Sequence, residues 1–82
     1  MHYVYVLQSL SSRRFYTGYT KDLRRRFEEH QNGFSISTKN KGPWKLVYYE
    51  ACNSSTDALI RERYLKTAWG KRYIKNRLKH SV

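Results

Sequence analysis

The chain has 82 residues and a mass of 9.9 kDa, which leaves room for one small domain and excludes a two-domain enzyme. Its 17 Lys and Arg stand against six Asp and Glu, and the resulting formal charge of +11 favours a polyanion as partner. Aromatic residues make up 16% of the chain, too many for a disordered basic tail, so we expect it to fold.

Cysteine usage and hydropathy indicate the cytoplasm. The single cysteine, Cys52, cannot form an intramolecular disulfide, and no secretory segment precedes the first strand-like run. The apolar runs are far shorter than a membrane-spanning helix needs, so no membrane association is expected. The three histidines and Cys52 lack zinc-finger spacing, and the sequence contains neither a Gly-rich phosphate loop nor a Ser nucleophile elbow.

The first 20 residues predict a β-hairpin. Residues 2–7 and 15–20 are both rich in β-branched and aromatic residues, and a Ser-rich basic connection joins them. Period two places Tyr5 on one face of the first strand, and Tyr16 and Gly18 on one face of the second. Whether these faces coincide depends on the strand register, which the pattern leaves open.

A helix is predicted over about residues 21–32. Thr20 or Asp22 can cap its start, and Gly33 offers a C-terminal stop. Arg26 and His30 lie four residues apart and border the apolar stripe of this helix.

A polar loop and a third strand follow. Residues 35–42 carry Lys39 and Lys41 and form a loop that could move toward a ligand. Residues 44–50 are predicted to be the third strand.

The C-terminal third predicts two helices. The first opens at a capping box formed by Ser54 and Asp57 and runs to about Thr67. Gly70 then separates it from a short basic helix over residues 71–79. The resulting order, β-β-α-β-α-α, predicts an α+β fold with a small antiparallel-containing sheet.

Glu62 is the most informative single residue. It lies in the middle of a helical apolar stripe of Ala58, Leu59, Leu65 and Trp69, and residues 58–82 contain eight Lys or Arg but no other acid. A carboxylate near a core needs hydrogen bonds, a cationic partner or a metal ion. A structural salt bridge to Arg26 or Arg63 is the simpler alternative to a metal site.

The other polar candidates also allow two interpretations. Arg26 can cover the core with its stem or grip a phosphate, and His30 can be a hydrogen-bonded neighbour of the core or a proton relay. The tyrosines Tyr5, Tyr16 and Tyr19 can be ordinary strand aromatics or bases activated by nearby cations. They can also stack on unpaired nucleobases.

Several of these segments, in order and spacing, resemble the GIY-YIG nuclease family. Tyr3-Val4-Tyr5 is separated by ten residues from Tyr16-Thr17-Gly18, and residues 20–30, 43–50 and 58–62 follow in the family order. The chain is most similar to the small, single-domain bacterial branch, the UPF0213-like proteins. The chain departs from the pattern at Tyr3, where the family name has Gly, and at Tyr19, where relatives often carry Lys.

The resemblance implies one GIY-YIG-like domain over residues 1–82, with a three-stranded mixed or antiparallel sheet flanked by helices. It implies a metal-dependent endonuclease that hydrolyses DNA phosphodiester bonds, in repair or recombination and with a protein partner for targeting. The implied catalytic residues are Tyr5, Tyr16, Arg26, His30 and Glu62, and Glu62 would also bind one Mg²⁺ or Mn²⁺. Nucleic-acid contacts are expected at Lys21, Arg25, Lys39, Lys41 and Asn76. When bound to DNA, the protein would associate with the nucleoid.

Two other functions remain open at this stage. A non-catalytic DNA- or RNA-binding protein could retain the nuclease fold, because charge and aromatic content suit binding as well as cleavage. A structural interaction module would show little salt-sensitive affinity for DNA.

Overall fold

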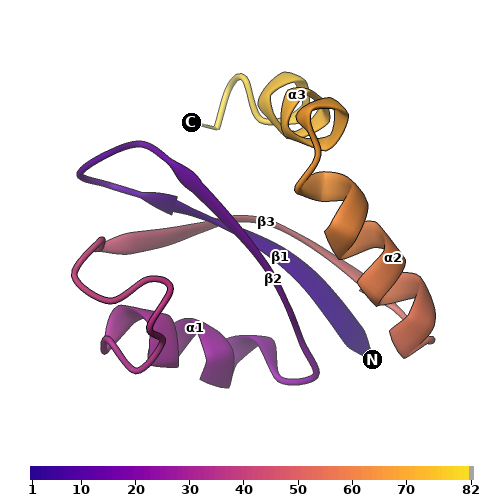
Figure 1. Ribbon diagram of the computed structural model, residues 1–82, viewed down its shortest axis with the longest axis horizontal. Helices are drawn as coiled ribbons and strands as arrows, with labels where there is room; N and C mark the ends of the chain where they lie inside the picture. The colour runs from indigo at the N-terminus through magenta and orange to yellow at the C-terminus, as the bar shows by residue number, and fades with distance from the viewer. Residues whose placement is uncertain (82) are drawn as a thin grey trace.

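The computed structural model describes residues 1–81, so Val82, the end of the expected domain, lies outside the described residues. Six elements follow one another along the chain (Figure 1). They are β1 (His2–Ser9), β2 (Phe15–Thr20), α1 (Leu23–Gln31), β3 (Trp44–Cys52), α2 (Ser55–Leu65) and α3 (Ala68–Arg77). This order confirms the predicted α+β fold.

The three strands form one sheet in the order β2-β1-β3, and β1 pairs antiparallel with both neighbours. Of the mixed and antiparallel alternatives, the antiparallel sheet is therefore the one observed. A register shift between Val6 and Leu7 bends the pairing of β1 with β3.

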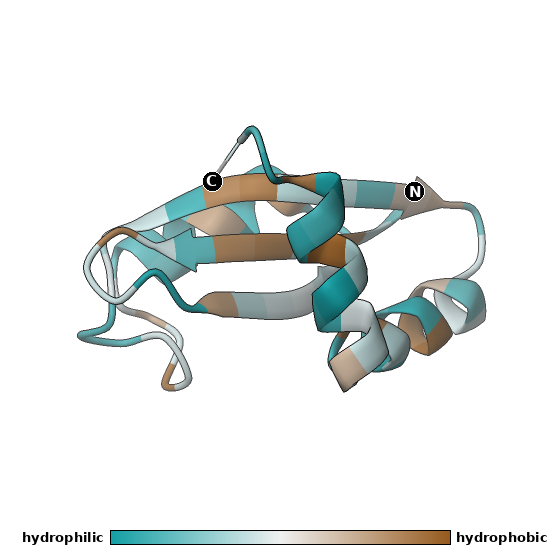
Figure 2. Cartoon of the chain, turned by 90° about the horizontal axis from the view of Figure 1, so that it is seen from above, coloured by the Kyte–Doolittle hydropathy of each residue, from teal (hydrophilic) through white to brown (hydrophobic). Residues whose placement is uncertain are grey.

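Helices cover both faces of the sheet, with α1 on one side and α2 and α3 on the other (Figure 1). The central strand β1 is consequently buried on both faces. Val4 and Val6 pack with residues of α2 and α3, whereas Tyr5 and Leu7 pack toward α1 and the start of β3. Hydrophobic residues concentrate along the strands, and the helices carry many hydrophilic residues (Figure 2).

The hairpin register places Tyr5 opposite Gly18, and Leu7 opposite Tyr16. Tyr5, Tyr16 and Gly18 therefore share one face of the sheet, which answers the question that the sequence pattern left open. The ring of Tyr5 lies across Gly18: a Cβ at that position would be 2.5 Å from Cζ and 3.0 Å from Cε1 of Tyr5. Only glycine leaves room for this ring position.

The first helix begins where its capping residue predicts. The carboxylate of Asp22 accepts a hydrogen bond from the backbone N–H of Arg25 at 3.1 Å, and α1 ends before Gly33, which has φ +76°.

The boundary between the last two helices differs from the prediction. The helix expected to reach Thr67 ends at Leu65, and α3 begins at Ala68 rather than at residue 71. Thr67 caps α3 by accepting a hydrogen bond from the N–H of Gly70 at 3.1 Å, so Gly70 lies inside the helix. Its lack of a side chain lets the α3 backbone contact that of Tyr64 and Leu65.

The predicted apolar stripe is wrong at two of its four positions. Ala58 and Leu65 are buried, but Leu59 is 42% exposed and Trp69 is 69% exposed. Trp69 lies on α3 rather than on α2, so the regular spacing from Ala58 no longer applies to it. Within residues 1–81, no helix is long and apolar enough to cross a membrane.

Candidate active site

Tyr5 of β1, Tyr16 of β2 and His30 of α1 meet on the α1 side of the sheet. The hydroxyl of Tyr5 lies 2.8 Å from Nε2 of His30, in a buried hydrogen bond. The ring of Tyr16 meets that of His30 edge-on, with the centroids 5.0 Å apart. Three of the five predicted catalytic side chains are therefore in one cluster.

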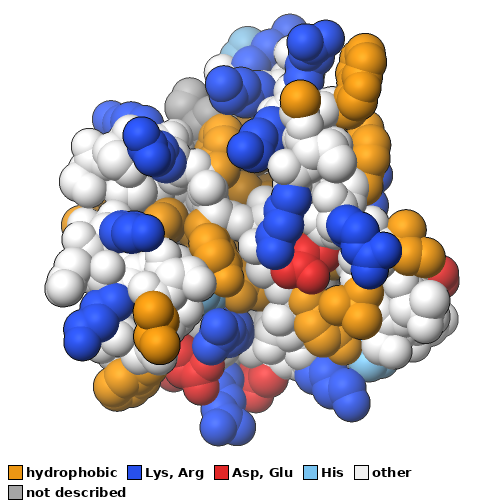
Figure 3. Space-filling model, in the orientation of Figure 1, with side chains coloured by type: hydrophobic (Ala, Val, Ile, Leu, Met, Phe, Trp, Pro, Cys, Tyr) orange, Lys and Arg blue, Asp and Glu red, His pale blue; other side chains and the backbone are white. Residues whose placement is uncertain are grey.

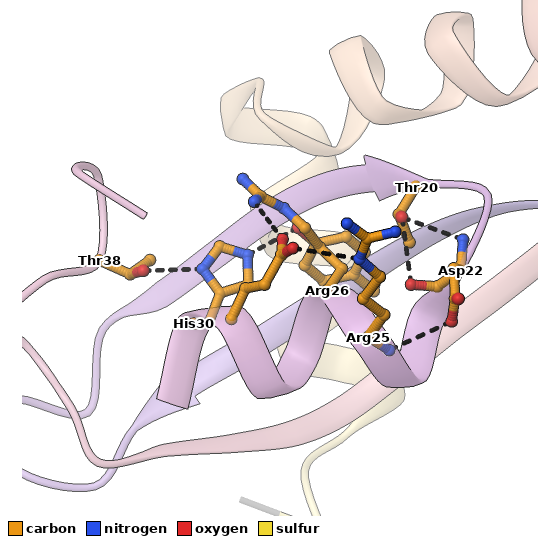
Figure 4. Close-up of polar contacts among 8 residues, drawn as sticks. Thr20, Asp22, Arg25, Arg26, His30 and Thr38 are labelled. Carbon is orange, nitrogen blue, oxygen red and sulfur yellow. Dashed lines mark hydrogen bonds and ion pairs between the residues drawn. The ribbon is translucent and has the colours of Figure 1, made fainter. Parts of the chain in front are cut away.

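The second nitrogen of His30 is also engaged. Its Nδ1 lies 2.7 Å from Oγ1 of Thr38, as Figure 4 shows, and Thr38 is buried. The backbone carbonyl of Thr38 accepts a hydrogen bond from Nε1 of Trp44 at 3.2 Å. A buried chain thus runs from Thr38 through His30 to Tyr5. Sequence reasoning missed Thr38, because nothing in a polar loop indicates which hydroxyl closes over the helix.

This chain also constrains the loop over residues 35–42. The loop was expected to be able to move, but Thr38 is fixed at its centre, and the carbonyl of Lys41 accepts a 2.7 Å hydrogen bond from Ser9 Oγ. Ile36 and Lys39 nevertheless remain exposed.

Burial keeps the central pair uncharged at neutral pH. Desolvation raises the pKa of Tyr5 to about 12, although the neighbouring Arg26 guanidinium opposes this rise. Desolvation lowers the pKa of His30 to about 4, and the positive charge of Arg26 contributes to the shift. The phenol and the imidazole are both neutral at pH 7, and both shifts oppose transfer of the phenol proton to the imidazole in the free protein.

Arg26 borders this cluster and is partly exposed. Its Nη1 lies 2.9 Å from Oε1 of Glu29, and this hydrogen bond raises the pKa of Arg26. Glu29 also pairs with Nε of Arg25 at 3.4 Å, and both arginines are drawn in Figure 4. The Arg26 side chain also lies against Tyr5, whose interaction contributes to the raised pKa of Arg26. Since Arg26 is one-third exposed, its remaining N–H groups can reach an anion.

Glu62 lies on α2, which packs against β1 and β2 on the face of the sheet opposite α1 (Figure 1). Its side chain is only 19% exposed, and its carboxylate pairs with Nζ of Lys66 at 3.1 Å. The expected salt bridge to Arg26 or Arg63 is therefore wrong, because a lysine one helical turn away is the nearer cation. The charge of Glu62 is the smallest of the causes that act on the pKa of Tyr5, well behind burial.

A metal ion at this site would have one protein carboxylate. Residues 1–81 contain no group of three His, Cys, Asp or Glu side chains that could hold a metal. Mg²⁺ commonly keeps several waters and takes one or two carboxylates together with substrate phosphate. A single, mostly buried Glu62 fits that kind of binding and does not fit a site formed by the protein alone.

The predicted nucleic-acid contacts divide into two groups. Lys21 and Arg25 line a hollow of about 290 Å³ together with Arg26. Lys41 lines a second one, the loop hollow, of about 570 Å³, which also includes Tyr16. Lys39 and Asn76 are exposed, and neither lines these two hollows.

Comparison with known proteins identifies the family of this chain. The family model described as the GIY-YIG catalytic domain matches residues 1–78. The chain belongs to the GIY-YIG family. The matched segment falls within the single domain predicted over residues 1–82.

Within this family, the chain is similar to UPF0213 proteins. It is 40% identical over 67 residues to one from Clostridium perfringens, covering 80% of this chain and 71% of the relative. It is 39% identical over 67 residues to one from Staphylococcus saprophyticus, covering 80% of each protein. The solution NMR structure of the UPF0213 protein BH0048 from Bacillus halodurans is 33% identical, covers 92% of this chain and 82% of that one, and has a TM-score of 0.57.

Proposed function

We propose that this GIY-YIG protein is a metal-dependent DNA endonuclease that hydrolyses phosphodiester bonds. The observation that carries the proposal is the cluster on the α1 side of the sheet, where the Tyr5 hydroxyl is hydrogen-bonded to Nε2 of His30 at 2.8 Å and the Tyr16 ring packs against the His30 ring. An acid at the core margin, a phenol hydrogen-bonded to a histidine and a partly free arginine are the groups that phosphodiester hydrolysis needs.

Arg26 would bind the scissile phosphate. Its guanidinium offers several N–H donors in one plane, which suits two oxygens of a phosphate. Glu29 holds one of these donors in the free protein, and this contact orients the guanidinium before substrate arrives.

Tyr5 would take the proton of the attacking water, and its own proton would pass to Nε2 of His30, 2.8 Å away. Because burial raises the pKa of Tyr5 to about 12, the phenol cannot act as a free phenolate at pH 7. The pKa of His30 is about 4 in the free protein, so this transfer would require the negative charge of the bound phosphate, which favours the imidazolium. Before this transfer, Nδ1 would carry the proton of the neutral His30 ring and donate it in a hydrogen bond to Oγ1 of Thr38, which leaves Nε2 free to accept. Tyr16 would close the site beside the His30 ring.

Glu62 would hold one Mg²⁺ or Mn²⁺. When bound, such an ion stabilises the charge of the phosphate and of the leaving oxygen. Lys66 keeps the Glu62 carboxylate paired in the free protein, so we expect weak metal affinity until DNA supplies further oxygen ligands.

One observation favours a second candidate function, binding of DNA or RNA without cleavage. The Glu62–Lys66 pair already satisfies the carboxylate, as a purely structural acid would be satisfied. Such a binder would retain the +11 charge and would have no use for divalent metal.

A cleavage panel separates these functions. Duplex, flap, junction and single-stranded DNA are incubated with the pure protein in Mg²⁺, Mn²⁺ or EDTA, beside Glu62→Gln and Arg26→Ala. We expect metal-dependent nicking by the wild type, none by Glu62→Gln, and DNA binding by Glu62→Gln that is equal or tighter. Nicking that survives Glu62→Gln would refute the mechanism, and absence of nicking with intact binding would leave the second function. The preferred substrate would also show whether a repair or recombination role, with a targeting partner, applies.

A further inference from the structure

Four cations converge where the β1–β2 turn meets α3. Arg13 and Arg14 of the turn, with Lys71 and Lys75 of α3, line a hollow of about 520 Å³, here called the turn hollow. Ser12 and Phe15 complete its lining, so no acid faces the four positive charges. In Figure 3, Lys and Arg side chains gather over α3 and over the β1–β2 turn, whereas the acids visible on that face lie elsewhere.

The turn hollow continues into the loop hollow beside the candidate active site. Ser12, Arg14 and Phe15 line both, and the loop hollow adds Lys41 and the candidate catalytic Tyr16. A polyanion lying along this path would pass from α3, over the start of β2, to the cluster around Tyr5.

The backbone of Arg13 provides a second, independent observation. Arg13 has φ +66°, a conformation that glycine or asparagine adopts more readily than arginine. Its N–H donates to the carbonyl of Ser9 at 2.9 Å, which fixes the turn. A charged side chain is therefore held at a position where backbone geometry favours glycine, as is common where a side chain has a function.

We propose that the turn hollow and the loop hollow bind the sugar–phosphate backbone of DNA and guide the strand to the candidate active site. This inference rests on the proposed function for its choice of DNA. Four cations with no acid among their lining neighbours form a concave positive surface that can neutralise the phosphates of a strand. Ser11, Ser12 and Ser37, which line the two hollows, add hydroxyl groups that can contact phosphate oxygens. None of the four residues was singled out from the sequence, because the turn and α3 are far apart along the chain.

The test measures binding without cleavage. In a Glu62→Gln background, anisotropy of a labelled DNA duplex gives the affinity at several salt concentrations for Lys71→Ala, Lys75→Ala and Arg13→Gly. Arg24→Ala is the matched control: it also removes one exposed cation, but from a hollow on the β3 side of α1, lined by Tyr49 and Leu46.

We expect each hollow variant to lower the slope of log affinity against log salt by about 1, and the control to leave it unchanged. Arg13→Gly should keep or raise the thermal midpoint while weakening DNA binding, because glycine relieves the positive φ. Hollow variants that bind like Arg24→Ala would overturn the proposal. If the wild-type protein does not cleave DNA but these slopes are as expected, the proposed nuclease activity would be refuted and the proposed DNA-binding path would stand.

Discussion

Replacing Gly18 with alanine tests the arrangement of the Tyr5 ring. A Cβ at residue 18 would meet the hydroxyl of Tyr5 and come within 2.5 Å of its Cζ, so the ring must move. Because Tyr5 is 1% exposed and hydrogen-bonded to His30, it has no free space to move into without breaking that bond.

The expected loss of stability combines two effects. Overpacking of a filled core costs about 1–3 kcal/mol. A buried polar group left without its partner costs about 1–3 kcal/mol more. We therefore expect Gly18→Ala to lower the free energy of unfolding by about 2–6 kcal/mol.

A double-mutant cycle isolates the contact. Tyr5→Leu removes the distal ring atoms that a Cβ at residue 18 would meet, so in that background Gly18→Ala should cost less than about 0.5 kcal/mol. Urea unfolding of the four proteins, followed by circular dichroism, measures both values. Equal costs of Gly18→Ala in the two backgrounds would refute the reasoning, because the effect would then come from the strand backbone and not from Tyr5.

Three further predictions concern stability. The pKa of His30 is about 4 in the folded protein, against an ordinary value of 6.5. The contribution of neutral His30 to stability is therefore complete above pH 6.5 and is lost, by up to about 3 kcal/mol, as the pH drops toward 4. Urea unfolding at a series of pH values should show this loss, and His30→Asn should flatten the pH dependence. Thr38→Val should lower the free energy of unfolding by about 1–3 kcal/mol and change the ¹⁵N chemical shifts of the His30 ring, because it removes the hydroxyl partner of Nδ1. Thr38→Ser, the control, should preserve those shifts. Unchanged His30 shifts in Thr38→Val would contradict the buried chain of hydrogen bonds. Gly70→Ala should lower the thermal midpoint, because a Cβ at residue 70 would meet the backbone of α2, which cannot move aside. Gly33→Ala is the control, and the midpoint should change less in that variant. Equal midpoints in the two variants would argue against the close contact at Gly70.

The fold could be predicted because its signals are local. Alternation of residues in the first 20 positions indicates the hairpin, and Asp22 and Ser54 cap the helices that follow them. The start of α3 could not be predicted, because a glycine in the sequence suggests the end of a helix. In the structure Gly70 lies inside α3, where its missing side chain allows close contact with the backbone of Leu65, and the sequence does not show this contact.

The candidate site could be predicted in part for the same reason. The inward position of Glu62 follows from its helical spacing to the buried Ala58 and Leu65, and its side chain is 19% exposed. The predicted salt-bridge partner of Glu62, Arg26 or Arg63, was wrong, because the pairing with Lys66 depends on side-chain conformations that the sequence does not show. Thr38 and the four cations of the turn hollow could not be found, because each contact joins segments whose distance in space depends on the whole fold.

The central claim is that Glu62 holds a divalent ion beside the Tyr5 phenol when DNA is bound. Its most direct test is nuclear magnetic resonance of the protein–DNA complex with ¹³C-labelled tyrosine, titrated with Mn²⁺, whose unpaired electrons broaden nearby signals. We predict that the ring signals of Tyr5 and Tyr16 broaden first in the wild type and stay sharp in Glu62→Gln at the same Mn²⁺ concentration. Equal broadening in both proteins, or broadening confined to tyrosines outside the cluster, would contradict the account.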